Sequence, residues 1–220
     1  MFDMPRFKTV IFDFDGTLAE TGDGVITSAR YALNALGKPL PGDDEMRLFL
    51  GPPLDYSYRE ICHLDEDDIP KAIKLYREFY SEKGLYMLRL YDGITELLTE
   101  LSNAGVVLAT ASSKPEVYLK EAVKTVGIDK YLSFICGKAL DDTDASKEKV
   151  ILKALTALGA DKQTTLLVGD RCFDIESAKR VGIKSAGVLF GYGTKEELLS
   201  CGADYIAETA RDIFRIVDKA

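Results

Sequence analysis

From Tyr91 onward, short apolar runs alternate regularly with segments in which apolar residues recur at helical spacing. The apolar runs predict strands at 106–111, 133–136, 165–168, 185–189 and 205–207. The periodic segments predict helices at 93–104, 115–126, 147–158, 175–181, 195–199 and 210–217. With a further apolar run at 8–12, this alternation predicts an α/β fold, in which a doubly wound, Rossmann-like parallel sheet carries helices on both faces.

Residues 19–88 follow a different pattern, because apolar positions recur at helical spacing and no segment predicts a convincing strand. Turn-forming sequences such as Gly51-Pro52-Pro53 separate three periodic stretches, at 25–36, 54–62 and 69–80. We therefore expect a helical cap domain at 19–88, inserted into a catalytic core made of 1–18 and 89–220.

Acidic residues outnumber basic ones by nine to two within 43–68 of this expected cap. Such a charge run is typical of a solvated face. Its two arginines, Arg47 and Arg59, stand out by their scarcity and are candidates for binding an anionic group. The alternative is that both form surface pairs with neighbouring acids.

The apolar run of the first predicted strand ends at Asp13-Phe14-Asp15-Gly16. Strand alternation places Asp13 and Asp15 on the same face, and Gly16 allows the chain to turn away from the sheet. Two carboxylates next to a core need a cation or strong hydrogen bonds. The simpler alternative is a turn at the strand end with solvated acids.

Polar residues also follow the later predicted strands, at positions that parallel topology brings to one edge of the sheet. Ser112, Ser113 and Lys114 follow one strand, and the acidic loop 141–146 leads to Lys147 at the start of a helix. A lysine there is unfavourable for the helix dipole, which suggests another role. Each feature alone has an ordinary explanation as a cap, a turn or a solvated side chain.

Two more acids, Asp170 and Asp174, follow the strand at 165–168 and are expected on one face of the first helical turn. Together with Asp13 and Asp15 they make four carboxylates at one sheet edge, which requires a cation. Oxygen ligands without histidine or cysteine favour Mg²⁺.

Composition and charge exclude several other classes of protein. A formal net charge of −8 argues against a nucleic-acid polymer as partner, and no apolar run is long enough to span a membrane. The single histidine, His63, leaves neither a Ser-His-Asp triad nor a multi-histidine metal site well supported. Residues 1–8 lack a signal-peptide apolar region, and four scattered cysteines suggest reduced thiols, so we expect a cytoplasmic protein. Those cysteines are Cys62, Cys136, Cys172 and Cys201.

The ordered motifs Asp13-Phe14-Asp15-Gly16-Thr17, Ser112, Lys147 and Gly169-Asp170-x-x-x-Asp174 resemble the four motifs of the haloacid dehalogenase superfamily. The resemblance covers nearly the whole chain. The helical insertion, Gly51-Pro52-Pro53-Leu54 and the Gly187–Gly193 stretch resemble its phosphoglycolate phosphatase-like branch, which includes 5′-nucleotidase-like members. These motifs are specific for the superfamily and weakly informative about substrate.

The resemblance implies a Mg²⁺-dependent phosphatase that acts on a small phosphorylated metabolite. Asp13 would be the nucleophile that forms an aspartyl-phosphate, and Asp15 the general acid and base, with its backbone carbonyl on the metal. Asp13, Asp170 and Asp174 would hold Mg²⁺, and Lys147 would stabilise the negative charge. Ser112 would bind the phosphoryl group, with Ser113 beside it, and Lys114 and Arg47 are candidates for a second anionic group of the substrate.

Related reactions remain as alternatives. Dehalogenases of the superfamily lack the second acid, so Asp15 disfavours them. A phosphonatase would need a cap lysine, and Lys38, the only lysine between residues 9 and 70, lies in no supporting motif. A β-phosphoglucomutase-type enzyme usually has Glu-Asp in place of Gly169-Asp170. A 5′-nucleotidase acting on nucleoside monophosphates and a non-catalytic module that binds phosphorylated ligands stay open.

Overall fold

The computed structural model describes residues 5–140 and 146–218. The acidic loop singled out in the sequence therefore lies largely outside the described residues, at 141–145. The chain forms two compact units. One, the core unit, comprises Met1–Glu20 and Leu90–Ala220, and the other, the cap unit, comprises Thr21–Arg89.

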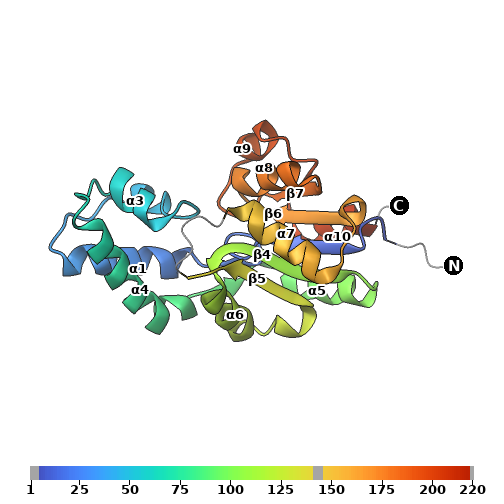
Figure 1. Cartoon of the computed structure of the whole chain (residues 1–220), viewed down its shortest axis with the longest axis horizontal. Coiled ribbons are helices and arrows are strands. Elements are labelled where there is room, and N and C mark those ends of the chain that lie inside the picture. The colour runs from blue at the N-terminus through green and yellow to red at the C-terminus, as the bar shows by residue number, and fades with distance from the viewer. Residues whose placement is uncertain (1–4, 141–145, 219–220) are drawn as a thin grey trace. The chain divides into compact units, whose positions relative to one another are not determined.

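The core unit is built on a six-stranded sheet in which all paired strands are parallel. Its strands lie in the order β5-β4-β1-β6-β7-β8 (Figure 1). They are β1 (Thr9–Phe12), β4 (Val107–Pro115), β5 (Phe134–Lys138), β6 (Thr165–Gly169), β7 (Lys184–Val188) and β8 (Tyr205–Ala207). This confirms the predicted doubly wound parallel sheet.

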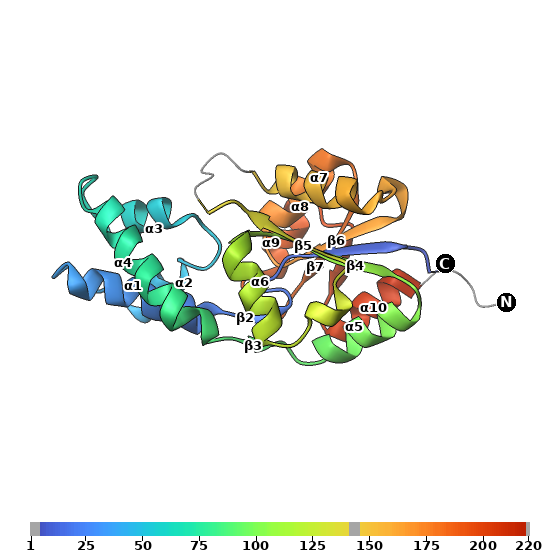
Figure 2. The ribbon, with the colours of Figure 1, turned by 60° about the horizontal axis from the view of Figure 1, so that its bottom comes forward.

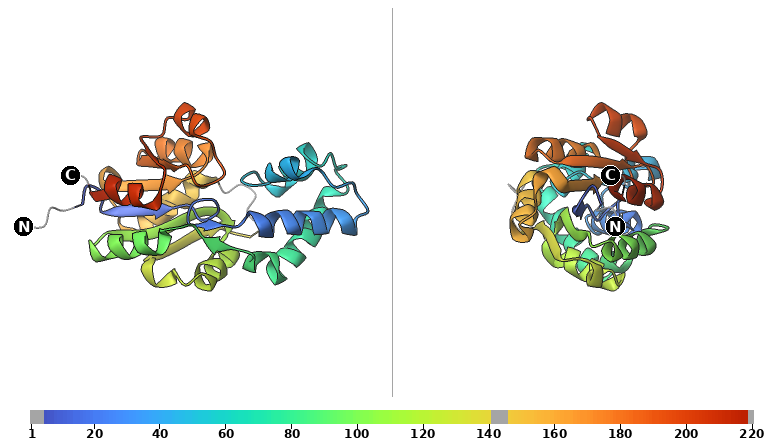
Figure 3. Two further views of the ribbon diagram at one scale, coloured as in Figure 1. Left: turned by 180° about the vertical axis from the view of Figure 1, so that it is seen from behind. Right: turned by 90° about the vertical axis from the view of Figure 1, so that its right-hand side faces the viewer.

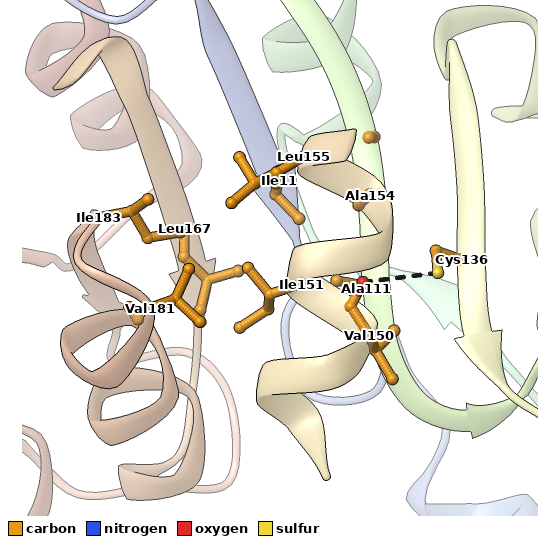
Figure 4. Packing of buried hydrophobic residues seen from close by; sticks show 12 residues of the cluster. Ile11, Ala111, Cys136, Val150, Ile151, Ala154, Leu155, Leu167, Val181 and Ile183 are labelled. Atoms are coloured by element: carbon orange, nitrogen blue, oxygen red, sulfur yellow. Dashed lines mark hydrogen bonds between the residues drawn. The ribbon is translucent and has the colours of Figure 1, made fainter. Parts of the chain in front are cut away.

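Helices cover both faces of this sheet, with α7 and α8 on one side and α5 and α10 on the other (Figure 2). The core helices are α5 (Ile94–Asn103), α6 (Glu116–Thr125), α7 (Lys147–Leu158), α8 (Cys172–Val181), α9 (Lys195–Ser200) and α10 (Ala210–Asp218). Figure 4 shows how α7 packs: Val150, Ile151 and Leu155 point toward the sheet residues Ile11 and Ala111. All five side chains are buried, so the helical spacing of apolar residues in α7 reflects this contact.

The strand β1 lies at the centre of the sheet and fixes where polar residues gather. Phe12 is in register with Thr110 of β4 on one side and with Val168 of β6 on the other. The chain runs from β1 to β4 and β5 on one side and then returns to β6 on the other side. Strand order therefore reverses at β1, and ligands of such folds bind beyond the carboxyl ends of the strands at that point.

The cap unit is helical, and in it α1 (Gly22–Ala35) and α4 (Ile69–Glu82) pack against each other (Figure 3). Two shorter helices are α2 (Asp43–Arg47) and α3 (Leu54–Glu60). The sequence pattern missed one pairing: β2 (Ala19–Glu20) forms a two-stranded sheet with β3 (Arg89–Leu90) where the chain passes between the units. Strands of two residues are too short to show a period.

One expectation about the cysteines is wrong. Cys172 and Cys201 form a disulfide with a Cα–Cα distance of 5.6 Å, whereas Cys62 and Cys136 are free thiols. Cysteine usage therefore no longer supports the cytoplasmic location, which stays a prediction. Among the described residues, no helix combines the length and the apolar character that crossing a membrane requires.

Candidate active site

The carboxyl ends of β1, β4 and β6 bring distant polar residues together. The backbone N–H of Asp13 donates to the carbonyl of Val168 at 2.8 Å, which continues the pairing of β1 with β6 by one residue. Ser112 lies two residues beyond Thr110 and Asp170 two residues beyond Val168, so both flank the end of β1. Parallel register thus assembles residues that are far apart in the sequence at one sheet edge.

Lys147 lies between two of these carboxylates. Its Nζ lies 2.9 Å from Oδ2 of Asp13 and 2.8 Å from Oδ1 of Asp174. The lysine side chain is only 6% exposed, so these two pairs are shielded from solvent. Both carboxylates also accept a backbone hydrogen bond, Asp13 from Phe14 at 2.8 Å and Asp174 from Arg171 at 3.1 Å. The unfavourable helix-start position of Lys147 is therefore compensated by charge pairing.

Asp170 is fully buried and is held differently. The hydroxyl of Thr17 donates to its Oδ1 at 3.1 Å, and the backbone N–H of Tyr192 donates to its Oδ2 at 2.9 Å. Asp170 precedes α8, whereas Asp174 lies in the first turn of that helix. The expectation that both acids share a helical face is therefore wrong, and the loop carries Asp170 instead.

Burial without enough positive charge makes this cluster electrostatically unfavourable. Burial raises the pKa of Asp13 to about 6, with Lys147 opposing the rise and Asp174 adding to it. Burial, together with the charges of Asp174 and Asp13, raises the pKa of Asp170 to about 8, against the lowering effect of the hydrogen bonds from Tyr192 and Thr17. For Lys147, burial alone would lower the pKa, but the two carboxylates outweigh it and the pKa is raised.

The donor set fits a hard divalent cation. One carboxylate oxygen from each of Asp13, Asp170 and Asp174 lies within 4.8 Å of the other two. All three donors are oxygens, which Mg²⁺ prefers. A cation there would favour the ionised form of Asp13 and Asp170, whose pKa values are raised mainly by burial and further by neighbouring carboxylates.

Asp15 is separate from this cluster and pairs with Lys114. The lysine Nζ lies 2.7 Å from Oδ1 of Asp15, and the lysine side chain is 5% exposed against 29% for the aspartate. The sequence placed Lys114 as a candidate for substrate binding, and the structure instead shows it against the expected acid–base residue. Asp15 remains partly open to solvent, as a group that exchanges protons with a reactant must be.

The two serines of β4 differ in environment. Ser112 is buried, its hydroxyl accepts from the backbone N–H of Lys114 at 3.3 Å, and a side-chain hydrogen bond from Ser112 acts to lower the pKa of Asp13, against burial as the main influence. Ser113 is exposed. Only Ser112 is therefore placed beside Asp13, although both lie at the same sheet edge.

The turn after Asp15 requires glycine for two reasons. Gly16 has a φ of +77°, which side chains with a Cβ rarely adopt. A Cβ at this position would also lie 2.2 Å from Oδ2 of Asp170. Gly16 therefore allows the loop that carries Asp13 and Asp15 to approach Asp170 closely.

Comparison with known proteins shows the family to which the chain belongs. Residues 10–188 match the family model of haloacid dehalogenase-like hydrolases. The chain belongs to that family. It is 36% identical over 193 residues to a 5′-nucleotidase of Pseudomonas aeruginosa, covering 88% of this chain and 87% of that protein. It is 30% identical over 218 residues to a phosphoglycolate phosphatase of Vibrio parahaemolyticus, covering 96% of each.

The solved structures show the same fold. A haloacid dehalogenase-like hydrolase from Streptococcus pneumoniae aligns with a TM-score of 0.90 and 30% identity, over 96% of this chain and 98% of that one. The fold class and the family predicted from the sequence are thereby confirmed for this haloacid dehalogenase-like hydrolase.

The candidate residues of the cap unit differ in the contacts they make within that unit. Arg59 pairs with Glu66 at 2.7 Å and lies 3.8 Å from Asp55, which favours the surface-pair alternative for this residue. Arg47 is exposed at the end of α2. Lys38 pairs with Asp68 at 2.6 Å, an arrangement that gives a phosphonatase-type imine lysine no support.

Sequence reasoning assigned no role to one contributor to the site of this hydrolase. Tyr192 donates its backbone N–H to Asp170. It belongs to the Gly187–Gly193 stretch, whose sequence resembles the phosphoglycolate phosphatase-like branch without indicating a role for this residue. A backbone donor leaves no signature in residue type. The glycines on either side of Tyr192 are the signal that the chain approaches another backbone closely there.

Proposed function

We propose that this haloacid dehalogenase-like hydrolase is a Mg²⁺-dependent phosphomonoesterase that acts through a phosphorylated Asp13. One observation carries the proposal. Asp13, a half-buried carboxylate with a raised pKa, pairs with a buried lysine and stands beside two further carboxylates, with a partly exposed acid two residues along the chain. That set provides a nucleophile, charge stabilisation and a proton donor without any histidine.

In the proposed first step, an Asp13 oxygen attacks phosphorus and the bond from phosphorus to the ester oxygen breaks. Asp15 gives a proton to the leaving alcohol oxygen. In the second step, Asp15 takes a proton from water, which attacks phosphorus and releases inorganic phosphate and Asp13. Lys147 and Ser112 stabilise charge on Asp13 and on the phosphoryl oxygens.

Asp13, Asp170 and Asp174 would hold Mg²⁺, together with the backbone carbonyl of Asp15. When bound, the ion neutralises the nucleophile and the phosphoryl group so that two anions approach each other. The remaining work belongs to the protein. Thr17 and Tyr192 fix Asp170 by hydrogen bonds, and Lys147 keeps Asp13 and Asp174 in place.

For the substrate we propose phosphoglycolate, whose carboxylate offers a second anion for Arg47 or Lys114. The phosphoglycolate phosphatase relative covers nearly all of this chain, which supports this choice. A nucleoside monophosphate is the second candidate, because the 5′-nucleotidase relative has the higher identity, 36%. The Lys114 contact with Asp15 adds a competing use for that lysine, so Arg47 is the better candidate for selectivity.

A substrate panel tests the proposal. Purified protein with Mg²⁺ is assayed for phosphate release from phosphoglycolate, mononucleotides, hexose phosphates and pyrophosphate, with Asp13→Asn as the matched control. We expect the highest kcat/KM for phosphoglycolate and a loss of at least about a thousandfold in Asp13→Asn. Equal activity in the two proteins would exclude the covalent mechanism. Interconversion of sugar phosphates without net phosphate release would favour a mutase, and no turnover of any phosphoester would favour a binding module.

A further inference from the structure

The segment Phe190–Gly193, which follows β7 and leads into α9, contacts Asp170 directly. The backbone N–H of Tyr192 donates to Oδ2 of Asp170 at 2.9 Å. A Cβ at Gly191 would lie 2.2 Å from the carbonyl oxygen of Gly16 and 2.4 Å from Cβ of Asp170. The segment therefore packs against the two loops that carry Asp15 and Asp170. At position 191 the approach is so close that only glycine fits.

The same segment also contacts the two places where the chain leaves and re-enters the core unit. We call these the linker segments, residues 18–20 and 90–91. The phenol of Tyr192 donates to Oε1 of Glu20 at 3.3 Å. The ring of Phe190 lies against the ring of Tyr91, with centroids 5.1 Å apart. The backbone N–H of Tyr91 donates to the carbonyl of Leu18 at 3.1 Å, which joins one linker segment to the other.

Contacts downstream anchor the segment to the start of α8. Oε1 of Glu197 in α9 accepts from the backbone N–H of Cys172 and from Nε of Arg171, both at 2.9 Å. The Cys172–Cys201 disulfide joins the end of α9 to the same helix start covalently. Since Asp170 lies between β6 and this helix start, the chain on either side of the segment has little freedom to move relative to Asp170.

We propose that Phe190–Gly193 couples cation binding at Asp170 to the order of the linker segments, with Tyr192 as the positioning residue. A cation held by Asp170 fixes the orientation of the carboxylate, which fixes the backbone of Tyr192. The phenol of that residue then holds Glu20. Linkage makes this coupling reciprocal. The factor by which cation binding favours the ordered linker segments equals the factor by which their disorder weakens cation binding. This inference rests on the Mg²⁺ site of the proposed function.

The test uses the full chain and two conservative variants. Tyr192→Phe removes the phenol contact and keeps the backbone donor to Asp170, and Glu20→Gln removes the charge of its partner. Tyr131→Phe is the matched control, because it also removes a tyrosine hydrogen bond in the core unit, the one that the phenol oxygen accepts from the hydroxyl of Thr99 at 2.9 Å. Mg²⁺ binding is measured by calorimetry, and amide hydrogen exchange is followed in peptides that cover 18–20, 90–91 and 169–174, with and without Mg²⁺.

We expect Mg²⁺ to slow exchange in all three peptides of the wild-type protein and of Tyr131→Phe. In Tyr192→Phe and Glu20→Gln the slowing at 169–174 remains, whereas the slowing in the linker peptides falls at least about threefold. Mg²⁺ affinity in both variants falls by about threefold to tenfold, the size of one net hydrogen bond. Excess Mg²⁺ then restores kcat, which a purely structural defect would not allow.

The coupling would be overturned if Mg²⁺ slowed amide exchange in the linker peptides of Tyr192→Phe as much as in those of Tyr131→Phe. The same holds if wild-type protein binds Mg²⁺ without any change in its linker peptides. In both cases Asp13-dependent hydrolysis would stand, so the proposed function would survive. Absence of calorimetric Mg²⁺ binding to the wild-type protein would overturn the coupling and the metal requirement of the proposed function together.

Discussion

One buried charge cluster of the core unit differs from an exposed ion pair of the cap unit in this haloacid dehalogenase-like hydrolase. In the core unit, Lys147 is buried and pairs with Asp13 and Asp174, which come from other elements of the sheet edge. In the cap unit, Arg59 pairs with Glu66 seven residues away, and both side chains are well exposed, 40% and 72%. Burying a charge is costly, whereas a surface pair contributes little.

This difference shows which charges carry information about function. Burying the charge of Lys147 between two carboxylates costs free energy, and the proposed chemistry at the site gives a reason for that cost. An exposed pair such as Arg59–Glu66 needs no function. The proposed reaction therefore rests on buried charges of the core unit, whereas the proposed choice of substrate rests on an exposed residue of the cap unit.

Replacing one positively charged residue in each unit tests this difference most strongly. Lys147→Met leaves the half-buried Asp13 and the buried Asp174 without the lysine charge, so we expect a loss of about 3–5 kcal/mol in the free energy of unfolding and a loss of most of the activity. Arg59→Met removes an exposed pair, so less than about 1 kcal/mol is expected. Urea unfolding and phosphate release measure both. Equal destabilisation by the two variants would show that burial does not distinguish these charges.

The pH dependence of stability tests the burial of carboxylates in the core unit. Asp13 and Asp170 have folded-state pKa values raised to about 6 and about 8 from an ordinary 3.8. The folded protein therefore holds protons that the unfolded chain has lost, so the stability from these groups is complete below about pH 4. It falls as the pH rises through 6 for Asp13 and through 8 for Asp170.

Asp170→Asn removes the second of these titrations. Without Mg²⁺, we expect its Tm to match that of the wild-type protein below about pH 4 and to exceed it by at least about 5 °C near pH 9. Added Mg²⁺ should reverse this order, since only the wild-type protein binds the ion with its full carboxylate set. A Tm difference that stays constant with pH would contradict the raised pKa of Asp170.

The smallest effect is expected in the cap unit and depends on substrate. If Arg47 contacts the carboxylate of phosphoglycolate, Arg47→Ala raises KM for that substrate by about tenfold, the size of a charged hydrogen bond. KM for p-nitrophenyl phosphate, which lacks a carboxylate, should not change. Arg59→Ala is the control and should leave both values unchanged. Equal KM values for phosphoglycolate in wild-type protein and Arg47→Ala would remove the main support for this substrate.

The sheet edge was predictable because strand patterns and parallel topology determine it. Asp13, Ser112 and Asp170 each follow an apolar run, and parallel strands bring such positions to the same edge. The helix-dipole argument suggested another role for Lys147, and the structure shows this residue paired with Asp13 and Asp174.

Three features depended on contacts that residue types do not reveal. The Lys114–Asp15 pair depends on side-chain direction at the end of β4, and the Tyr192 contact uses a backbone donor. The pairing of Cys172 with Cys201 requires α8 and α9 to lie together, which spacing in the sequence does not show. Each of these is a long-range contact between loops or short elements, where periodicity carries no information.

The central claim is that Asp13 itself attacks phosphorus, and the stereochemical course of the reaction tests this most directly. A phosphorothioate ester made chiral at phosphorus with oxygen isotopes is hydrolysed by the wild-type protein with Mg²⁺. Two successive in-line displacements, first by Asp13 and then by water, predict net retention of configuration. Net inversion would mean that water attacks the substrate in a single step, and it would contradict the role assigned to Asp13.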